Sequence, residues 1–326
     1  MTWFLFALVC MLGWGCADLF YKKGTDDSDR YSHLKIAVWV GMVMGACSLL
    51  LLFLPVGEKN WGSIGEFLRD TVRYLPASSS YILSMVIGYA GLRYLEVSIV
   101  SPVQNASGAL SAMCMAVYFT VFGKFESITD EFSVLDFIGT ALIVVSVIAL
   151  AVVEQRLEDK ERKTVDAEAD KKYRYGALAL LFPILYCVFD TVGTAADGII
   201  LDGEAGMGLD EISVLILYGL TFLAAGLAAW VILWVKEKKP YRPFAKTERS
   251  KGIAAVCEEF GQIFYVYAMA ENPVLAAPLV ASYCIVSMLL SRVFLREKLT
   301  KAQYFCIFAV VAGIVLLGIS EGLAEL

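Results

Sequence analysis

The sequence has very little of what metal sites and nucleic-acid surfaces are made of. His33 is the only histidine among 326 residues, so zinc or iron sites built from several histidines are excluded. Lysine and arginine number 27 against 33 aspartates and glutamates, which gives a formal charge of −6. A nucleic-acid-binding protein would carry a basic face instead. We therefore expect no metal, no cofactor and no nucleic-acid partner.

The signatures of disulfide-linked folds and of enzymes are also missing. The eight cysteines occur singly within apolar runs, with no Cys-x-x-Cys, and are interpreted as small hydrophobic residues. The sequence has no Gly-x-Ser-x-Gly, His-Glu-x-x-His or phosphate-binding glycine loop. The Gly-x-Gly-Asp motif of intramembrane aspartyl proteases is absent as well. An enzyme is not expected.

Long apolar runs are what the sequence has in abundance. Hydrophobic residues make up 59% of the chain, charged residues only 18%, and the mean hydropathy is +0.67. A soluble protein would be about 45–50% apolar and about 25% charged. Apolar runs long enough to cross a bilayer as a helix, which takes about 20 residues, fall at 2–21, 33–55, 76–95, 98–121, 133–153, 174–200, 211–235, 252–271, 274–294 and 302–320. The prediction is an all-α polytopic membrane protein with ten transmembrane helices.

The distribution of basic residues predicts the orientation of these helices. Most of the 27 lysines and arginines lie in the loops that follow the first, third, fifth, seventh and ninth runs. Loops rich in lysine and arginine stay in the cytoplasm. Both termini are therefore predicted to lie outside, and the protein is expected in the cell (cytoplasmic) membrane as a multi-pass protein.

Two segments between the runs have a composition of their own. Residues 154–173 are dense in charges of both signs, which is typical of a solvated cytoplasmic linker or a short charged helix. Asn60–Tyr74 is amphipathic and is predicted to lie on the outer membrane interface.

The two halves of the chain resemble each other. Asp18 in the first run matches Asp190 in the sixth, and an aromatic residue lies one turn before each of them, Trp14 and Tyr186. With five spans in each half, the second half must enter the membrane from the opposite face. The expected domains are a first five-helix repeat at 1–153, the linker at 154–173 and an inverted second repeat at 174–326. Inverted repeats are typical of secondary transporters, whose binding sites lie between the repeats.

Several motifs in the second half make the chain similar to a known family. The helix containing Pro278, the run Leu295-Arg-Glu297-Lys-Leu-Thr300-x-x-Gln303 and the later Gly313 resemble the EamA-type members of the drug/metabolite transporter superfamily. The resemblance implies transport of small metabolites through a central cavity lined by spans 1, 3, 4, 6, 8 and 9, with spans 5 and 10 at the periphery. Cys306 stands where the family has a glycine that the first half keeps as Gly139, a departure expected to affect helix packing.

Other short motifs have structural interpretations. Thr300-x-x-Gln303 and Ser133-x-x-Asp136 have the spacing of capping boxes, which predicts a helix start at each. Gly41-x-x-x-Gly45 predicts close packing of two helices.

Acidic residues within the spans are the strongest indication of function. They are Asp18, Asp190, Asp197, Glu258 and Glu259. A carboxylate at the centre of a membrane helix costs about 2.5–3.5 kcal/mol on insertion scales, and a proton, hydrogen bonds or a bound cation can stabilise it. The repeat-related pair Asp18 and Asp190 is preferred as a site. Two structural alternatives stay open. One is an ion pair of Asp18 with Lys22 or Lys23 at the membrane surface, and the other is a purely structural hydrogen bond for Asp190.

Aromatic and amide side chains complete the candidate site. An acid beside an aromatic ring suits an organic ammonium ion through charge and cation–π contact. Gln262 and Tyr265 share a helix face with Glu258, whereas Glu259 faces apolar neighbours. The candidate substrate-binding residues are Trp14, Asp18, Tyr89, Asn105, Tyr186, Asp190, Glu258, Gln262, Tyr265 and Tyr283.

These residues predict a secondary-active transporter that moves a small polar organic solute by alternating access. The expected solute is cationic or zwitterionic, such as a quaternary amine or an amino-acid-like metabolite, and protons are the candidate coupling ion. A neutral nucleoside or sugar, with structural acids, is the alternative. A non-transporting membrane sensor or an enzyme is a remote one. The expected partners are the solute and the lipid bilayer, and the chain is expected to be a monomer or a homodimer.

Overall fold

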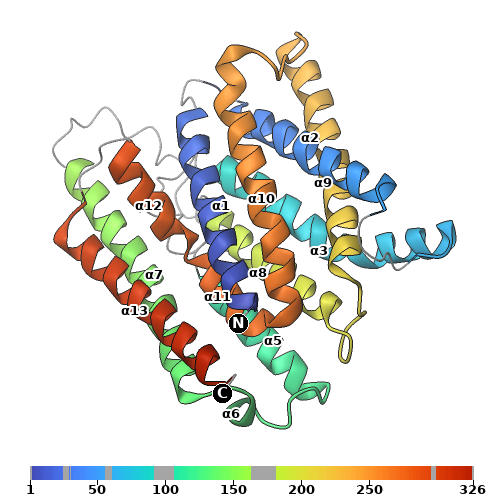
Figure 1. Cartoon of the computed structure of the whole chain (residues 1–326). Helices are drawn as coiled ribbons and strands as arrows, with labels where there is room; N and C mark the ends of the chain where they lie inside the picture. The colour runs from blue at the N-terminus through green and yellow to red at the C-terminus, as the bar shows by residue number, and fades with distance from the viewer. Residues whose placement is uncertain are drawn as a thin grey trace.

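Every regular element in the described part of the chain is a helix (Figure 1). The computed structural model describes residues 2–24, 29, 31–55, 61–91, 106–162, 181–294 and 299–324. The predicted all-α membrane fold is confirmed, since seven helical segments among these residues are long and apolar enough to cross a membrane. Each predicted span falls on a helix in the part of it that is described.

The helices follow the predicted spans in order. Those of the first half are α1 (Thr2–Gly24), α2 (Ser32–Phe53), α3 (Ile64–Gly91), α5 (Ser107–Val121), the single turn α6 (Ile128–Glu131) and α7 (Val134–Arg162). Those of the second half are α8 (Leu181–Leu201), α9 (Glu211–Glu237), the 3-10 turn η2 (Lys246–Glu248), α10 (Arg249–Glu271), α11 (Pro273–Ala281), α12 (Tyr283–Phe294) and α13 (Lys301–Ala324).

Three predicted boundaries need correction. Most of the segment Asn60–Tyr74 is not separate from the third span, because α3 runs from Ile64 through Pro76 as one helix, whose first part projects from the bundle in Figure 1. The ninth span is two helices, α11 and α12, with a break at Ser282. The first residues of the predicted linker continue α7 to Arg162, and 163–180 lie outside the described residues. The interfacial location of the start of α3 stays a prediction.

Local capping explains where several helices begin. The Ser133 N–H donates to Asp136 Oδ2 at 2.8 Å and the Asp136 N–H donates back to Ser133 Oγ at 3.2 Å. Thr300 and Gln303 bond in the same reciprocal way at 2.8 and 3.4 Å. Both predicted capping boxes are confirmed, and each satisfies N–H groups that the first turn of a helix leaves free.

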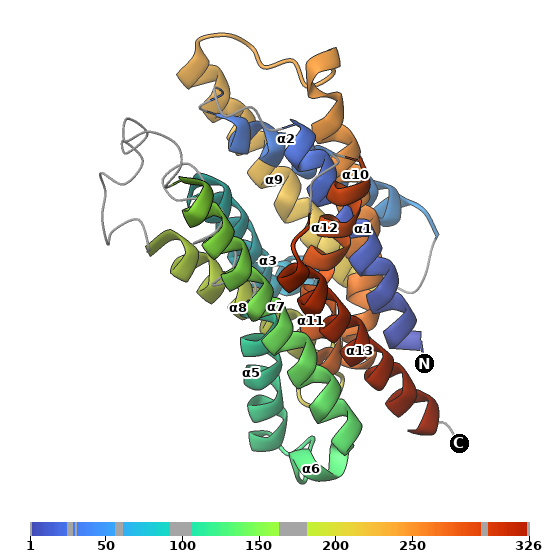
Figure 2. The same ribbon diagram turned by 90° about the vertical axis from the view of Figure 1, so that its left-hand side faces the viewer.

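Helices of the first half pack mainly against helices of the second. The four most extensive contacts join α1 to α10, α2 to α9, α7 to α13 and α3 to α8. If each span is replaced by its counterpart in the other half, five spans away along the chain, every one of these pairs becomes a pair of the same set. For example, the pair of spans 1 and 8 becomes the pair of spans 6 and 3. The pairing agrees with two five-helix repeats, whose boundaries stay a prediction. Both views place the chain ends toward the end of the bundle where α6 lies (Figures 1 and 2).

Glycines let three of these pairs approach closely. A Cβ on Gly13 of α1 would lie 2.8 Å from Gly261 Cα of α10, and a Cβ on Gly41 of α2 would lie 2.7 Å from Gly226 Cα of α9. A Cβ on Gly313 of α13 would lie 2.7 Å from the carbonyl oxygen of Gly139 in α7. Because no methyl group fits at these crossings, glycine is required there, and the packing role predicted for Gly41 is confirmed.

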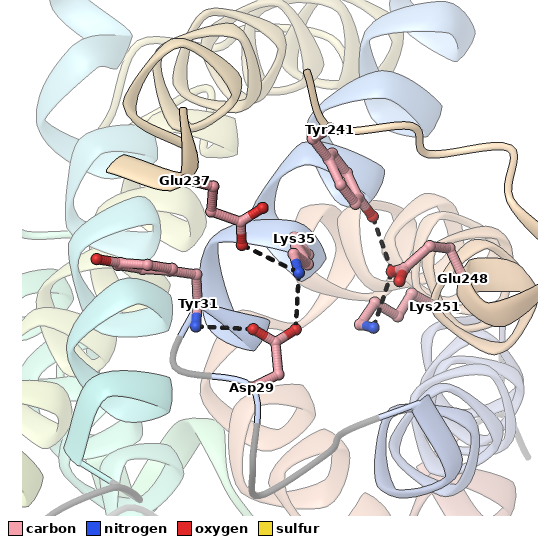
Figure 3. A network of polar contacts seen from close by, with 7 residues as sticks. All are labelled: Asp29, Tyr31, Lys35, Glu237, Tyr241, Glu248 and Lys251. Atoms are coloured by element: carbon pink, nitrogen blue, oxygen red, sulfur yellow. Dashed lines mark hydrogen bonds and ion pairs between the residues drawn. The ribbon is translucent and has the colours of Figure 1, made fainter. Parts of the chain in front are cut away.

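A group of ion pairs and hydrogen bonds lies at one end of the bundle, where the Lys35–Glu237 pair links the two halves (Figure 3). Lys35 near the start of α2 bonds to Asp29 Oδ2 at 2.9 Å and to Glu237 Oε1 at the end of α9 at 3.2 Å. In the connection to α10, Glu248 Oε2 accepts from the Tyr241 hydroxyl at 2.9 Å and from Lys251 Nζ at 2.8 Å. These contacts join α2 to α9 and fold the α9–α10 connection onto α10.

A second set of contacts joins the halves at the opposite end. Lys124, just after α5, pairs with Asp202, just after α8. The other Asp202 oxygen accepts from the Glu204 N–H at 3.0 Å and the Ala205 N–H at 2.7 Å. Burial opposes the charge of Asp202, but Lys124 and these N–H groups hold the pKa of the carboxyl below its usual range.

Replacing a crossing glycine is expected to destabilise the bundle. Gly41→Leu forces α2 away from α9, because its side chain would overlap Phe222 and Gly226 backbone atoms. The matched control is Ala46→Leu, on an exposed position of the same helix. Thermal unfolding in detergent should show a clear loss of stability for Gly41→Leu and little change for Ala46→Leu. Equal losses of thermal stability for the two substitutions would contradict a close crossing of α2 and α9 at Gly41.

The Lys124–Asp202 pair is expected to stabilise the fold in a pH-dependent way. Since the folded-state pKa of Asp202 is lowered, the stabilisation is present above the unfolded value of about 4 and is lost as the pH falls through the folded value. Asp202→Asn should lower the free energy of unfolding by about 1–3 kcal/mol at neutral pH. The difference from wild type, followed by thermal melts, should shrink below about pH 4. A difference in stability between Asp202→Asn and wild type that does not change with pH would contradict a stabilising Lys124–Asp202 ion pair.

Candidate functional site

Trp14 of α1 lies at the centre of an aromatic cluster. Its ring stacks on Tyr265 of α10 with centroids 5.3 Å apart and meets the edge of Tyr283 in α12 at 5.8 Å. Its Nε1 donates to the Glu258 carbonyl oxygen at 3.3 Å. The helices come this close because α10 has Gly261 here, where a Cβ would lie 2.4 Å from the indole. The structure thus brings together three predicted aromatic residues from α1, α10 and α12.

Tyr81 of α3 extends this cluster and was missed by sequence reasoning. Its hydroxyl lies 2.5 Å from the Tyr265 hydroxyl and donates to Thr194 Oγ1 of α8 at 3.1 Å. Its ring packs against Gly193, where a Cβ would lie 3.1 Å away, and edge-on to Tyr218 of α9 at 5.7 Å. The serine run at 78–80 immediately before Tyr81 was the available signal, because it marks a polar stretch within an apolar span.

The predicted acids of α1 and α10 bond to hydroxyl groups of neighbouring helices. Asp18 Oδ2 accepts a hydrogen bond from the Ser287 hydroxyl of α12. Glu258 Oε2 accepts one from the Tyr21 hydroxyl of α1. Lys23, an alternative partner for Asp18, lies over the Phe20 ring, with Nζ 5.6 Å from its centroid.

Glu259 was expected to face apolar neighbours, which is wrong. Its side chain is buried and hydrogen-bonds the Cys47 thiol of α2. Adjacent positions on a helix point about 100° apart, so Glu258 faces α1 while Glu259 faces α2. Gln262, one turn later, is buried, and its Nε2 has no hydrogen-bond partner among the described residues.

Asp190 approaches the same centre from α8. Its carboxylate hydrogen-bonds the Ser107 side chain of α5. The charges of Asp18, Asp190 and Glu258, from three different helices, all act on Tyr283. Each of these acids has a neutral hydroxyl group as its described partner.

The remaining predicted residues are placed less completely. Tyr186 is half-buried on α8, one turn before Asp190. Tyr89 lies on α3, but its side chain is outside the described residues, as is the whole of Asn105. Among the residues that are described, no group of three histidine, cysteine, aspartate or glutamate side chains could hold a metal ion.

The bundle of apolar helices, with acids and aromatic residues between its halves, is that of a polytopic membrane protein. The sequence model of the EamA-like transporter family matches residues 205–319. The resemblance is confirmed there, and this segment is EamA-like and belongs to the drug/metabolite transporter superfamily. The match points to a membrane transporter of this type, for which a small-molecule substrate and a lipid bilayer are the implied partners.

Solved structures agree with this fold. One crystal structure aligns with 98% of this chain and 98% of its own, with a TM-score of 0.64 and 13% sequence identity. At that identity the likeness shows the fold alone. No curated protein matches the chain.

The Tyr81 hydroxyl is expected to contribute to stability because it joins α3, α8 and α10. Tyr81→Phe keeps the ring on Gly193 but removes hydrogen bonds to Tyr265 and Thr194, so the free energy of unfolding should fall by about 1–3 kcal/mol. The control is Tyr304→Phe, which removes an exposed hydroxyl that bonds Arg292 and should change stability by less than about 0.5 kcal/mol. Chemical unfolding in detergent measures both, and a Tyr81→Phe effect as small as the control would contradict the role of the hydroxyl.

Proposed function

We propose that the protein is a secondary-active transporter of a small organic cation or zwitterion, such as a quaternary amine or an amino-acid-like metabolite. The observation that carries the proposal is the aromatic cluster of Trp14, Tyr265 and Tyr283, which lies between the halves, with Trp14 and Tyr265 on the helices that carry Asp18 and Glu258. Charge and cation–π attraction together favour an ammonium group at such a place. The described partners of these two acids are uncharged, which leaves their charge for a cation or a proton to balance.

The position of these residues supports transport by alternating access. Trp14 and Asp18 belong to the first half, and Asp190, Glu258 and Tyr283 belong to the second. A solute bound between them contacts both halves, so that rocking one half against the other exposes it to each side of the membrane in turn. The proposed location is the cell membrane with both termini outside, which puts the ion-pair network of Lys35 and Glu237 on the cytoplasmic side. The proposed oligomeric state is a monomer or a homodimer.

A neutral solute such as a nucleoside or sugar is the second candidate. The Gln262 side chain is 2% exposed and has an amide nitrogen without a described partner. The hydroxyls of Tyr81, Thr194 and Tyr265 lie close together nearby. Amides and hydroxyls recognise hydroxyl-rich solutes, and the acids would then be structural or carry protons.

The two candidates predict different ligands in a thermal-shift experiment on the purified protein. A ligand that binds the folded state stabilises it by mass action, by about 2.7 kcal/mol at a concentration of 100 Kd. The panel is choline, betaine, polyamines, amino acids, nucleosides and sugars at pH 6 and pH 8. We expect choline or a related ammonium compound to raise the melting temperature of the wild type, and Asp190→Asn to abolish the shift.

The matched control is Glu126→Gln, which neutralises an exposed carboxylate away from the site and should leave the shift unchanged. A shift seen only with nucleosides or sugars, and intact in Asp190→Asn, would contradict the cation proposal and favour the neutral solute.

A further inference from the structure

Asp197 of α8 is the most deeply buried acid of the described residues, and the site described above does not use it. Its side chain has 0% exposure. Oδ1 accepts a hydrogen bond from the Tyr74 hydroxyl of α3 at 2.8 Å. Oδ2 is buried with no partner within hydrogen-bond distance among the described residues, and the Tyr81 hydroxyl is the second polar group that interacts with the carboxyl. The described polar partners of this fully buried carboxyl are thus two neutral tyrosine hydroxyls.

The groups that face Asp197 are all uncharged in their ordinary state. They are Tyr74 and Tyr81 of α3, Tyr218 of α9 and Tyr265 of α10. The next residue of α8, Gly198, packs against Met115 of α5 and Pro273 of α11. No lysine, arginine or histidine is among these facing groups, so none of them compensates a negative charge on Asp197.

An ionised carboxylate without a cationic partner costs several kcal/mol in such surroundings. A protonated carboxyl does not carry that cost, and it offers one O–H donor while its carbonyl oxygen still accepts from Tyr74. We propose that Asp197 is a proton-binding site of the transporter, separate from the ammonium site. It holds a proton while α3 and α8 are packed together and releases it when they separate. This inference rests on the proposed transport function and specifies its coupling ion.

The proton exchange is simple. When α3 moves away from α8, water reaches the carboxyl, its O–H bond breaks and the proton passes to water, leaving a hydrated carboxylate. The reverse step, from the other side of the membrane, restores the neutral acid before the helices close again. A charged Asp197 therefore opposes closure and a neutral one allows it.

Tyr81 connects this site to the aromatic cluster. Its hydroxyl contacts both Thr194, one turn before Asp197, and Tyr265, which stacks on Trp14. Asp190 is two turns away from Asp197 on the same helix, about 10 Å along its axis. Separation of α3 from α8 at Asp197 thus also moves a tyrosine that contacts the proposed solute site, which couples the two.

Whether Asp197 carries a proton can be tested on the purified full-length protein without any solute. Infrared spectroscopy detects the carbonyl stretch of protonated carboxyl groups. At neutral pH the wild type and Asp190→Asn should both show the component due to Asp197, and Asp197→Asn should lose it. If Asp197→Asn does not fold, Tyr74→Phe serves instead, because loss of the donor to Oδ1 should shift that component in frequency. A spectrum that neither substitution changes would overturn the proposal.

The coupling is tested with the full-length protein in liposomes, using choline as the probe and a pH-sensitive dye inside. A choline gradient should drive protons across the membrane in the wild type. Asp197→Asn should still exchange choline for choline, but its proton movement should fall to that of protein-free liposomes. Asp190→Asn should lose both. Unchanged proton movement in Asp197→Asn overturns the proposal. If the wild type moves no choline, the cation proposal fails, and the infrared result still decides whether Asp197 holds a proton.

Discussion

Close contact between glycines of opposite halves is the constraint on which the rest of the structure depends. Membrane helices gain little from hydrophobic association, because lipid is as apolar as their side chains, and they rely on close packing. Gly13 meets Gly261, Gly41 meets Gly226, and Gly139 meets Gly313. Each contact joins one helix from the first half to one from the second. The halves are thus held together along α1–α10, α2–α9 and α7–α13, with polar contacts closing both ends.

The α3–α8 pair differs from these three, and the difference shapes the proposed site. Gly193 on α8 faces not another glycine but the ring of Tyr81. The tyrosine brings a hydroxyl to the interior, where it bonds α8 and α10 together. Around it lie acids whose described partners are neutral hydroxyl or thiol groups. The interior between the halves therefore combines negative charge, aromatic rings and hydroxyls, the features on which the proposed ammonium and proton sites rest.

Much of this could be predicted from the sequence, because the signals concerned are local. Apolar length located the helices, and the spacing of Ser133 and Asp136 located the start of α7. The spacing of Trp14 and Asp18 on one helix indicated an acid beside an aromatic ring. Each of these inferences uses residues within one or two turns of each other, where helix geometry alone decides what is close.

The rest depends on partners far apart in the chain. The bond of Glu259 to Cys47, the contact of Tyr81 with Tyr265, and the pairing of Asp197 with Tyr74 all join different helices, so no pattern along one helix reveals them. The continuity of α3 through Pro76 was missed for another reason. The composition changes from amphipathic to apolar there, but the backbone accepts proline without ending the helix.

The most direct test of the account is whether the two halves hold each other after the chain is cut. A protease site is introduced between residues 162 and 181, and the purified full-length protein is cleaved there in detergent. Size-exclusion chromatography then shows whether the fragments stay together. We predict that the halves of the wild type elute as one complex and that Gly41→Leu combined with Gly139→Leu makes them separate. Separation of the wild-type halves, each remaining helical alone, would contradict the account.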